Sequence, residues 1–339
     1  MKKTLLTICL VWMCFSLSAQ KIIDLSGKWS FSIDRQDNGE KEKWFSHTLN
    51  DCINLPGSMP EKLKGDEVTA KTQWTGSLYD SSYYYNPYME KYRKEGNIKF
   101  PFFLTPDKHY VGAAWYQKEV NIPADWKGER ILLFLERPHI ETTVWVNGQK
   151  TGMQNSLCVP HQYDITHYVR PGKCTITIRV DNRIKEINVG PDSHSITDQT
   201  QGNWNGIVGR ICLQTTPKTY FDDIQIYPEP EQKLARVKVV IKGTGTAKVK
   251  LSAESFNTDK KHIVPAIQQE IKLNKGVTET EMVLPMGNDM LLWDEFHPAL
   301  YKLKAEVTNG KKTEIKEIQF GMRRFEILSL IHISEPTRL

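Results

Sequence analysis

Cysteine is scarce in this sequence, which excludes a disulfide-stapled scaffold and a cysteine zinc site. Six cysteines occur in 339 residues, and Cys9 and Cys14 lie in an N-terminal apolar run. The other four are too few to staple a chain of this length, and no two have CxxC spacing; they are Cys52, Cys158, Cys174 and Cys212. The histidines show neither HxH nor HExxH spacing. The sequence therefore predicts no metal site and no cofactor.

The sequence also lacks a strong charge of one sign, which excludes a nucleic-acid partner. Its 45 Lys and Arg residues exceed its 40 Asp and Glu residues by little, and the formal net charge is +5. Nucleic-acid binding needs basic residues that cluster on one face or in a run. The lysine pairs at Lys260-Lys261 and Lys311-Lys312 are isolated and typical of solvated turns.

Long hydrophobic runs are absent apart from the first residues. Lys2 and Lys3 precede an apolar run over residues 5–17, and Ser18 and Ala19 follow it. This layout is typical of a cleaved secretory signal, and the run is too short for a transmembrane helix. We therefore expect residues 1–19 to be a signal peptide and the mature protein to begin near Gln20. The protein is predicted to be exported, periplasmic or secreted, without membrane insertion.

Helical periodicity is almost missing, whereas the alternation of β-strands is plain. Residues 175–180 and 301–307 alternate strictly between apolar and polar side chains, and residues 131–135 form a continuous apolar run. Asn147-Gly148 is a strong signal for a type I′ hairpin turn. Trp115 and Trp145 lie in alternating patterns and are predicted to pack in a core. The chain is therefore predicted to be all-β.

The composition changes near residues 217–220, which predicts a domain boundary. Residues 20–217 are rich in Trp, Tyr and Gly, whereas in residues 218–327 Lys, Glu and Thr alternate with aliphatic side chains. The second stretch has the length of an immunoglobulin-like sandwich. Within the first, residues 78–109 form a connection that is unusually long and rich in aromatic residues. Connections of this length in compact domains are usually functional or disordered.

Several short motifs carry a resemblance to a known family. They are Trp115-Tyr116, Trp126-x-Gly128, Val144-Trp145-Val146-Asn147-Gly148, Tyr163-Asp164-Ile165-Thr166, Gly206-Ile207, Leu292-Trp293 and Phe320-Gly321-Met322-Arg323. Residues 24–327 thereby resemble the N-terminal portion of glycoside hydrolase family 2, the family of β-galactosidases, β-glucuronidases and β-mannosidases. The resemblance implies a jelly-roll sugar-binding domain over residues 20–217 and an immunoglobulin-like β-sandwich over residues 218–327.

The resemblance also implies that the catalytic part is missing. In the family the strand of Gly321-Met322-Arg323 leads into a (β/α)8 barrel, a fold of about 250 residues, which carries both catalytic glutamates. Residues 328–339 do not continue the family pattern and look like a translated sequencing adaptor, with a natural short tail as the alternative. We therefore assign no catalytic residue and expect the chain to be inactive alone.

Three residues are candidates for carbohydrate binding. Asp198 stands eight residues before Gly206-Ile207, and this segment resembles the one in β-galactosidases whose aspartate binds the terminal sugar. The alternative is a loop aspartate that caps backbone amides. Trp204 and Tyr84 are expected to stack on sugar rings, with core packing as the alternative. The pattern departs from the family at Gly209, where an arginine usually stands.

The sequence thus predicts the N-terminal fragment of an exported exo-β-glycosidase, with β-galactosidase as the leading activity. Its partner would be an oligosaccharide or polysaccharide substrate of the parent enzyme. A non-catalytic carbohydrate-binding or structural β-sandwich protein is the alternative. A third interpretation, an adhesion module, has no motif in its favour, and the oligomeric state stays open.

Overall fold

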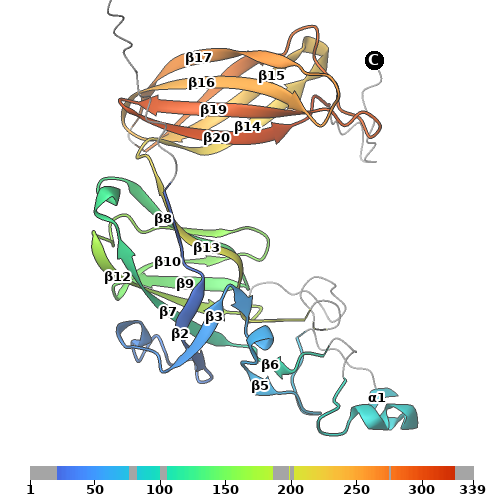
Figure 1. The fold of residues 1–339 in the computed structure, drawn as a ribbon. Helices are drawn as coiled ribbons and strands as arrows, with labels where there is room; N and C mark the ends of the chain where they lie inside the picture. The colour runs from blue at the N-terminus through green and yellow to red at the C-terminus, as the bar shows by residue number, and fades with distance from the viewer. Residues whose placement is uncertain are drawn as a thin grey trace, which may run out of the picture. The chain divides into compact units, whose positions relative to one another are not determined.

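The computed structural model describes residues 21–75, 82–99, 105–185, 198, 202–274 and 276–324. The chain divides into two compact units, one from Lys21 to Thr215 and the other from Thr216 onward. Nearly all regular structure in both units is antiparallel β-sheet (Figure 1). The predicted all-β class is therefore confirmed. Among the described residues, no helix is long and apolar enough to cross a membrane.

The first unit is a jelly-roll sandwich of two sheets. One sheet has the order β1-β13-β8-β11, with β4 also paired to β13, and the other has the order β10-β9-β12-β7-β2-β3. The strands are β1 (Ile22–Asp24), β2 (Gly27–Asp34), β3 (Asp51–Leu55), β4 (Gly57–Ser58), β7 (Ala113–Ile122), β8 (Arg130–Pro138), β9 (Glu141–Val146), β10 (Gln149–Asn155), β11 (His161–Asp164), β12 (Gly172–Asp181) and β13 (Gly206–Thr216).

Alternation along these strands builds the core between the sheets. Successive side chains on a strand point to opposite faces, so Trp29 and Phe31 of β2 both point inward and are buried. Phe31 packs on Tyr116 of β7, with 5.2 Å between ring centroids. The turn between β9 and β10 is the predicted type I′ hairpin, because Asn147 and Gly148 both have positive φ, 51° and 77°.

A second aromatic cluster covers the outer face of the six-stranded sheet. Trp115 and Trp145 project from that face, and the connection between β2 and β3 folds over them. Phe45 from this connection stacks on Trp145, with an interplanar angle of 6°. The Trp115 indole N–H donates to Asp34 at 2.9 Å. The predicted burial of Trp115 and Trp145 is confirmed, in a small core outside the main one.

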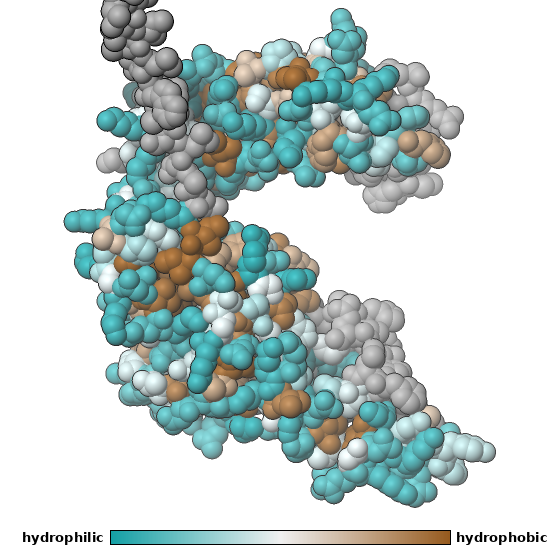
Figure 2. Space-filling model, viewed as in Figure 1, coloured by the Kyte–Doolittle hydropathy of each residue, from teal (hydrophilic) through white to brown (hydrophobic). Residues whose placement is uncertain are grey.

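The second unit is an immunoglobulin-like sandwich of a three-stranded and a four-stranded sheet. The orders are β14-β15-β18 and β17-β16-β19-β20. In β19 the side chains of Tyr301, Leu303, Ala305 and Val307 are all buried, while the two lysines and the glutamate between them lie on the opposite face of the strand. The visible face of this unit is accordingly mostly hydrophilic (Figure 2). Its strands are β14 (Tyr220–Glu229), β15 (Leu234–Lys242), β16 (Gly245–Phe256), β17 (Ile263–Leu273), β18 (Val277–Pro285), β19 (Leu300–Asn309) and β20 (Lys312–Phe320).

The long aromatic connection of the first unit contains short structure of its own. Two short strands, β5 (Asp66–Glu67) and β6 (Lys108–His109), pair with each other; β5 precedes the connection and β6 forms its last two residues. Between them lie helix α1 (Ser82–Tyr85) and the 3-10 helix η3 (Pro87–Tyr92). In Figure 1 this part projects beyond the sheets of the jelly-roll. We call the described residues 82–99 the aromatic insert.

Candidate functional site

Polar side chains from distant segments meet at one end of the jelly-roll. Strand β7 begins at Ala113, directly opposite Asp181 at the end of β12, so the residues just outside both strands are neighbours. Asn182 accepts a hydrogen bond from the Gly112 N–H at 2.8 Å. The Asn205 amide donates to the carbonyls of Gly112 and Val180, both at 2.9 Å. These buried amides hold the segments that carry the candidate site.

Asp198 joins two of these segments through its carboxylate. One oxygen accepts the Thr75 N–H at 2.6 Å and lies 3.4 Å from His109 Nε2, and the other accepts the Asn203 N–H at 2.5 Å. The Asp198 side chain is only 3% exposed. Its own N–H donates to the Thr75 carbonyl at 3.2 Å. We call Asp198, Thr75, Asn203, His109 and His139 the Asp198 cluster.

The surroundings of Asp198 keep its carboxylate ionised. Burial by itself raises the pKa of a carboxyl group. The hydrogen bonds from His109, the Asn203 N–H and the Thr75 N–H outweigh this effect, and the pKa of Asp198 lies below its usual value. Asp198 is therefore a hydrogen-bond acceptor at neutral pH and not a proton donor.

Two half-buried tryptophans each rest on a buried histidine of the cluster. Trp74 packs on His109 with 4.7 Å between ring centroids, and Trp204 stacks on His139 at 4.5 Å with an interplanar angle of 24°. Asn203 connects the two sides, because its amide donates to Thr75 Oγ1 at 3.0 Å and its carbonyl oxygen lies 3.1 Å from His139 Nε2. The cluster thus holds two half-buried indole rings, each packed against a buried imidazole ring.

His139 is neutral in this setting. Burial lowers the pKa of its imidazole to about 4, and neither the hydrogen bond to Asn203 nor the nearby Asp198 carboxylate restores the usual value. The neutral ring donates from Nε2 to the Asn203 carbonyl oxygen. Burying an uncharged imidazole costs less free energy than burying a charged one. The neutral His139 ring can therefore pack against the Trp204 indole in a buried position.

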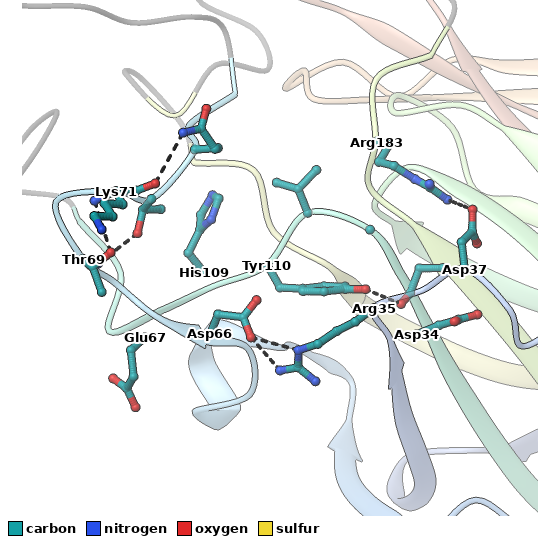
Figure 3. Close-up of a pocket in the computed structure, with 15 residues that line it drawn as sticks. Asp34, Arg35, Asp37, Asp66, Glu67, Thr69, Lys71, His109, Tyr110 and Arg183 are labelled. Carbon is teal, nitrogen blue, oxygen red and sulfur yellow. Dashed lines mark hydrogen bonds and ion pairs between the residues drawn. The ribbon is translucent and has the colours of Figure 1, made fainter.

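A polar cavity of about 490 Å³ adjoins the cluster and shares His109 with it (Figure 3). Ion pairs lie on two sides of the cavity: Arg35 donates to Asp66 at 2.6 Å, and Arg183 donates to Asp37 at 2.6 Å. The other lining residues are Asp34, Glu67, Thr69, Lys71, Thr72, Gln73, Tyr110, Val111, Gly112 and Ala113. The size of the cavity and its hydrogen-bonding lining suit a small polar ligand.

A buried ion network lies behind the cavity wall. Asp181 is fully buried and accepts hydrogen bonds from Arg183 at 2.6 Å, from Lys185 at 2.9 Å and from Arg179 at 3.1 Å. Arg179 also pairs with Asp37 at 2.6 Å. Burial would raise the pKa of Asp181, but its cationic partners hold that pKa well below its usual value. The network ties the connection after β2 to the end of β12.

These carboxylates are suited to binding and not to proton transfer. A general acid needs a pKa that is raised toward the working pH. Burial acts in that direction on Asp37, Asp181 and Asp198, but ion pairs and hydrogen bonds lower the pKa of all three below the usual value. Among the described residues, this end of the domain therefore offers aromatic faces and fixed hydrogen-bonding groups.

The three predicted site residues have different outcomes. Trp204 packs on His139 of the Asp198 cluster, and Asn203 connects His139 to Asp198. Asp198 caps two backbone N–H groups, as in the alternative interpretation, and also contacts the His109 side chain, while its contact with a sugar stays a prediction. Tyr84 lies in α1, but its side chain is outside the described residues. Its role and that of Trp204 likewise stay predictions.

Sequence reasoning missed Trp74, His109, Asn203 and His139. No short motif marks them, because Thr75 and Asn203 are 128 residues apart and His139 and Asn203 are 64 residues apart. One weak signal was available. Trp74 stands shortly before the long aromatic connection and His109 ends it, and β5 and β6 pair where the two ends of the connection meet.

Replacement of Asp198 by asparagine is expected to lower the free energy of unfolding by about 1.5–3 kcal/mol at pH 7. An amide accepts on one atom only, so either the Thr75 or the Asn203 N–H would face another donor. The folded-state pKa is lowered, so the carboxylate stabilises the fold above the unfolded pKa near 4 and this contribution disappears as the pH falls further. Urea unfolding followed by tryptophan fluorescence measures the difference.

Asp294 provides a matched control for this prediction. Its carboxylate also accepts two backbone N–H groups, from Phe296 at 2.8 Å and His297 at 2.7 Å, but its side chain is 36% exposed. Because water replaces lost partners at an exposed site, Asp294→Asn should change stability much less. Equal stability of Asp198→Asn and the unmodified chain at pH 7 would contradict a structural role for the buried carboxylate.

Both units of the chain resemble known proteins. The family profile described as "Glycosyl hydrolases family 2, sugar binding domain" matches residues 22–217, and that described as "Glycosyl hydrolases family 2" matches residues 219–323. A β-glucuronidase of Homo sapiens is 24% identical over 319 residues, 84% of this chain and 41% of the relative. A β-galactosidase large subunit of Lactobacillus acidophilus is 22% identical over 311 residues, 89% of this chain and 46% of the relative.

Solved structures support the same fold. The β-glucuronidase of Ruminococcus gnavus in complex with D-glucuronic acid aligns with a TM-score of 0.59 at 18% identity, over 91% of this chain and 47% of that one. The chain thus spans less than half the length of these relatives. No (β/α)8 barrel is present among the residues that the structure describes.

Proposed function

This chain belongs to glycoside hydrolase family 2, and we propose that it forms the N-terminal, sugar-binding portion of an exported exo-β-glycosidase. The lysine-led apolar run of residues 5–17 supports export. A mature N-terminus near Gln20, measured by mass spectrometry on protein from the periplasm or the medium, tests this part. The unprocessed chain in the cytoplasm would contradict it.

The observation that carries the proposal is the pair of indole rings at the polar end of the jelly-roll. Sugar-binding sites combine an aromatic surface with a few fixed hydrogen-bonding groups. Trp74 and Trp204 provide the aromatic surface, and the Asp198 cluster fixes both rings through His109 and His139. In this proposal the terminal sugar of the substrate packs against one or both rings while a catalytic domain cleaves the glycosidic bond.

The leading substrate is a terminal β-galactoside, which the resemblance of the segment around Asp198 favours. A β-glucuronide is the second candidate, because the human and Ruminococcus gnavus relatives are β-glucuronidases. Chromogenic β-galactosides and β-glucuronides given to the full-length parent enzyme distinguish the two. Sequencing the genomic locus tests whether a parent enzyme exists. An open reading frame that continues past Ile327 would encode it, whereas a true stop codon after Leu339 would favour the non-catalytic alternative.

In the parent enzyme, Trp74→Ala and Trp204→Ala are each expected to lower kcat/KM about fivefold to thirtyfold. Loss of one aromatic contact costs roughly 1–2 kcal/mol. Trp44→Ala is the control, because Trp44 is also half-buried but packs on Trp115 over the outer sheet face. Residues 20–339 alone should release no nitrophenol. Unchanged kcat/KM in both cluster variants, or activity of the isolated chain that depends on one of its own glutamates, would overturn the proposal.

A further inference from the structure

The aromatic insert is held together by its own contacts. Tyr83 is buried, and its hydroxyl donates to the Tyr92 carbonyl at 2.7 Å. Arg93 lies over the Tyr83 ring and donates to the Tyr83 carbonyl. The Asn86 side chain accepts the Tyr88 N–H at 3.0 Å and so begins η3. The described residues of the insert thus form a small folded unit around one buried tyrosine.

Two other tyrosines of the insert point into solvent. Tyr85 is 72% exposed and Tyr88 is 85% exposed, whereas Tyr110, Tyr116 and Tyr163 of the same domain are buried. Exposed aromatic rings offer apolar faces on which a sugar ring can pack, and here two such rings lie three residues apart. Three backbone steps of 3.8 Å separate their Cα atoms by at most about 11 Å, so one extended ligand can reach both.

The charge of the insert indicates the chemistry of that ligand. The insert carries four basic side chains and two acidic ones: Lys91, Arg93, Lys94 and Lys99 against Glu90 and Glu95. Glu90 is 3.5 Å from Lys94, and Lys91 lies 4.8 Å from the centre of the Tyr92 ring while remaining exposed. An exposed surface with excess positive charge attracts an anionic ligand. Exposed tyrosines beside lysines suit a polymer with both ring faces and carboxylates.

We propose that the aromatic insert binds an acidic polysaccharide, with Tyr85 and Tyr88 against its sugar rings and Lys91 and Lys94 near its carboxylates. This site is separate from the Asp198 cluster and shares no residue with it. It would hold the protein on a uronate-containing polymer, independently of which glycosidic bond the parent enzyme cleaves. The proposal needs no catalysis and therefore stands or falls separately from the proposed function.

Affinity electrophoresis of the mature chain in gels that contain polygalacturonate tests the proposal. We expect retardation of the unmodified chain and at least tenfold weaker binding for the Tyr85→Ala, Tyr88→Ala double variant. Lys91→Gln with Lys94→Gln should weaken binding at low salt, and added NaCl should weaken binding of the unmodified chain. Tyr227→Ala is the matched control, because Tyr227 is a 51% exposed tyrosine of the other domain. This variant should bind polygalacturonate as the unmodified chain does.

Several results would overturn the proposal. They are no retardation of the unmodified chain by polygalacturonate, equal retardation of the double variant, or equal retardation in neutral galactan. Concentration-dependent dimerisation in gel filtration that the double variant abolishes would assign the tyrosines to a second copy of the chain instead. Because both side chains are exposed, thermal unfolding of the double variant should match that of the unmodified chain, which separates lost binding from lost folding.

Discussion

Replacement of Asp181 by alanine is expected to destabilise the jelly-roll domain by about 3 kcal/mol at pH 7. Removing one partner of a buried ion pair leaves an uncompensated charge and costs about 3–5 kcal/mol. The low end applies here because Arg179, 9% exposed, keeps Asp37 at 2.6 Å and Glu141 at 3.5 Å. Arg183 likewise keeps Asp37 at 2.6 Å. Urea unfolding followed by tryptophan fluorescence at low ionic strength measures the loss.

An exposed ion pair of the same domain serves as the control. Glu136 accepts from Arg210 at 3.0 Å, but the Arg210 side chain is 76% exposed. Exposed pairs contribute little, because water and salt screen them. Glu136→Ala should leave the unfolding midpoint almost unchanged. If Asp181→Ala were as mild as Glu136→Ala, the buried network would not be what ties the connection after β2 to β12.

The second large effect is expected from pH and depends on His139. Its pKa falls from 6.5 to about 4 on burial in the folded protein. The unfolded chain therefore binds more protons than the folded one between these values, and stability is complete above about pH 6.5 and is lost as the pH falls toward 4. A shift of about 2.5 units corresponds to about 3 kcal/mol. We expect a loss of this size over this range, to which the buried His161 adds.

A His139→Gln variant isolates this contribution. Glutamine can still donate to the Asn203 carbonyl oxygen but does not titrate, so stability should fall less between pH 6.5 and 4 than in the unmodified chain. Unfolding by urea at several pH values gives the difference between the two profiles. His167 is exposed, and His167→Gln should leave the profile unchanged. Parallel profiles for His139→Gln and the unmodified chain would show that His139 is not buried in its neutral form.

The two pH effects occupy different ranges and can be separated. The pKa of Asp198 and that of Asp181 are lowered, so their contributions are lost only below the unfolded value near 4. The contribution of His139 to stability is lost at higher pH, between about 6.5 and 4. The part of the loss between pH 6.5 and 4 that His139→Gln removes therefore reports on the buried His139 under Trp204, and the rest of the loss in this range includes His161. Further loss below pH 4 reports on the carboxylates.

Strand positions and family membership were predictable because both depend on local patterns. The alternation at Tyr301, Leu303, Ala305 and Val307 places one face of β19 in a core whatever its neighbours are. Asn147-Gly148 forms its turn through its own backbone preferences, with both residues at positive φ. The family motifs are likewise short runs of adjacent residues. The all-β class and the two sandwich types followed from such runs.

Only the tertiary structure decided which side chains meet at the candidate site. Asp198 contacts Thr75, 123 residues away, and His109, 89 residues away. Arg183 contacts Asp37, 146 residues away. No local pattern encodes these contacts, because they arise where the ends of β7, β12 and β13 meet. The sequence by itself determined the strands and the family, since each depends on neighbouring residues. The burial of Asp198 and the packing of Trp74 on His109 and of Trp204 on His139 depend on contacts between distant segments.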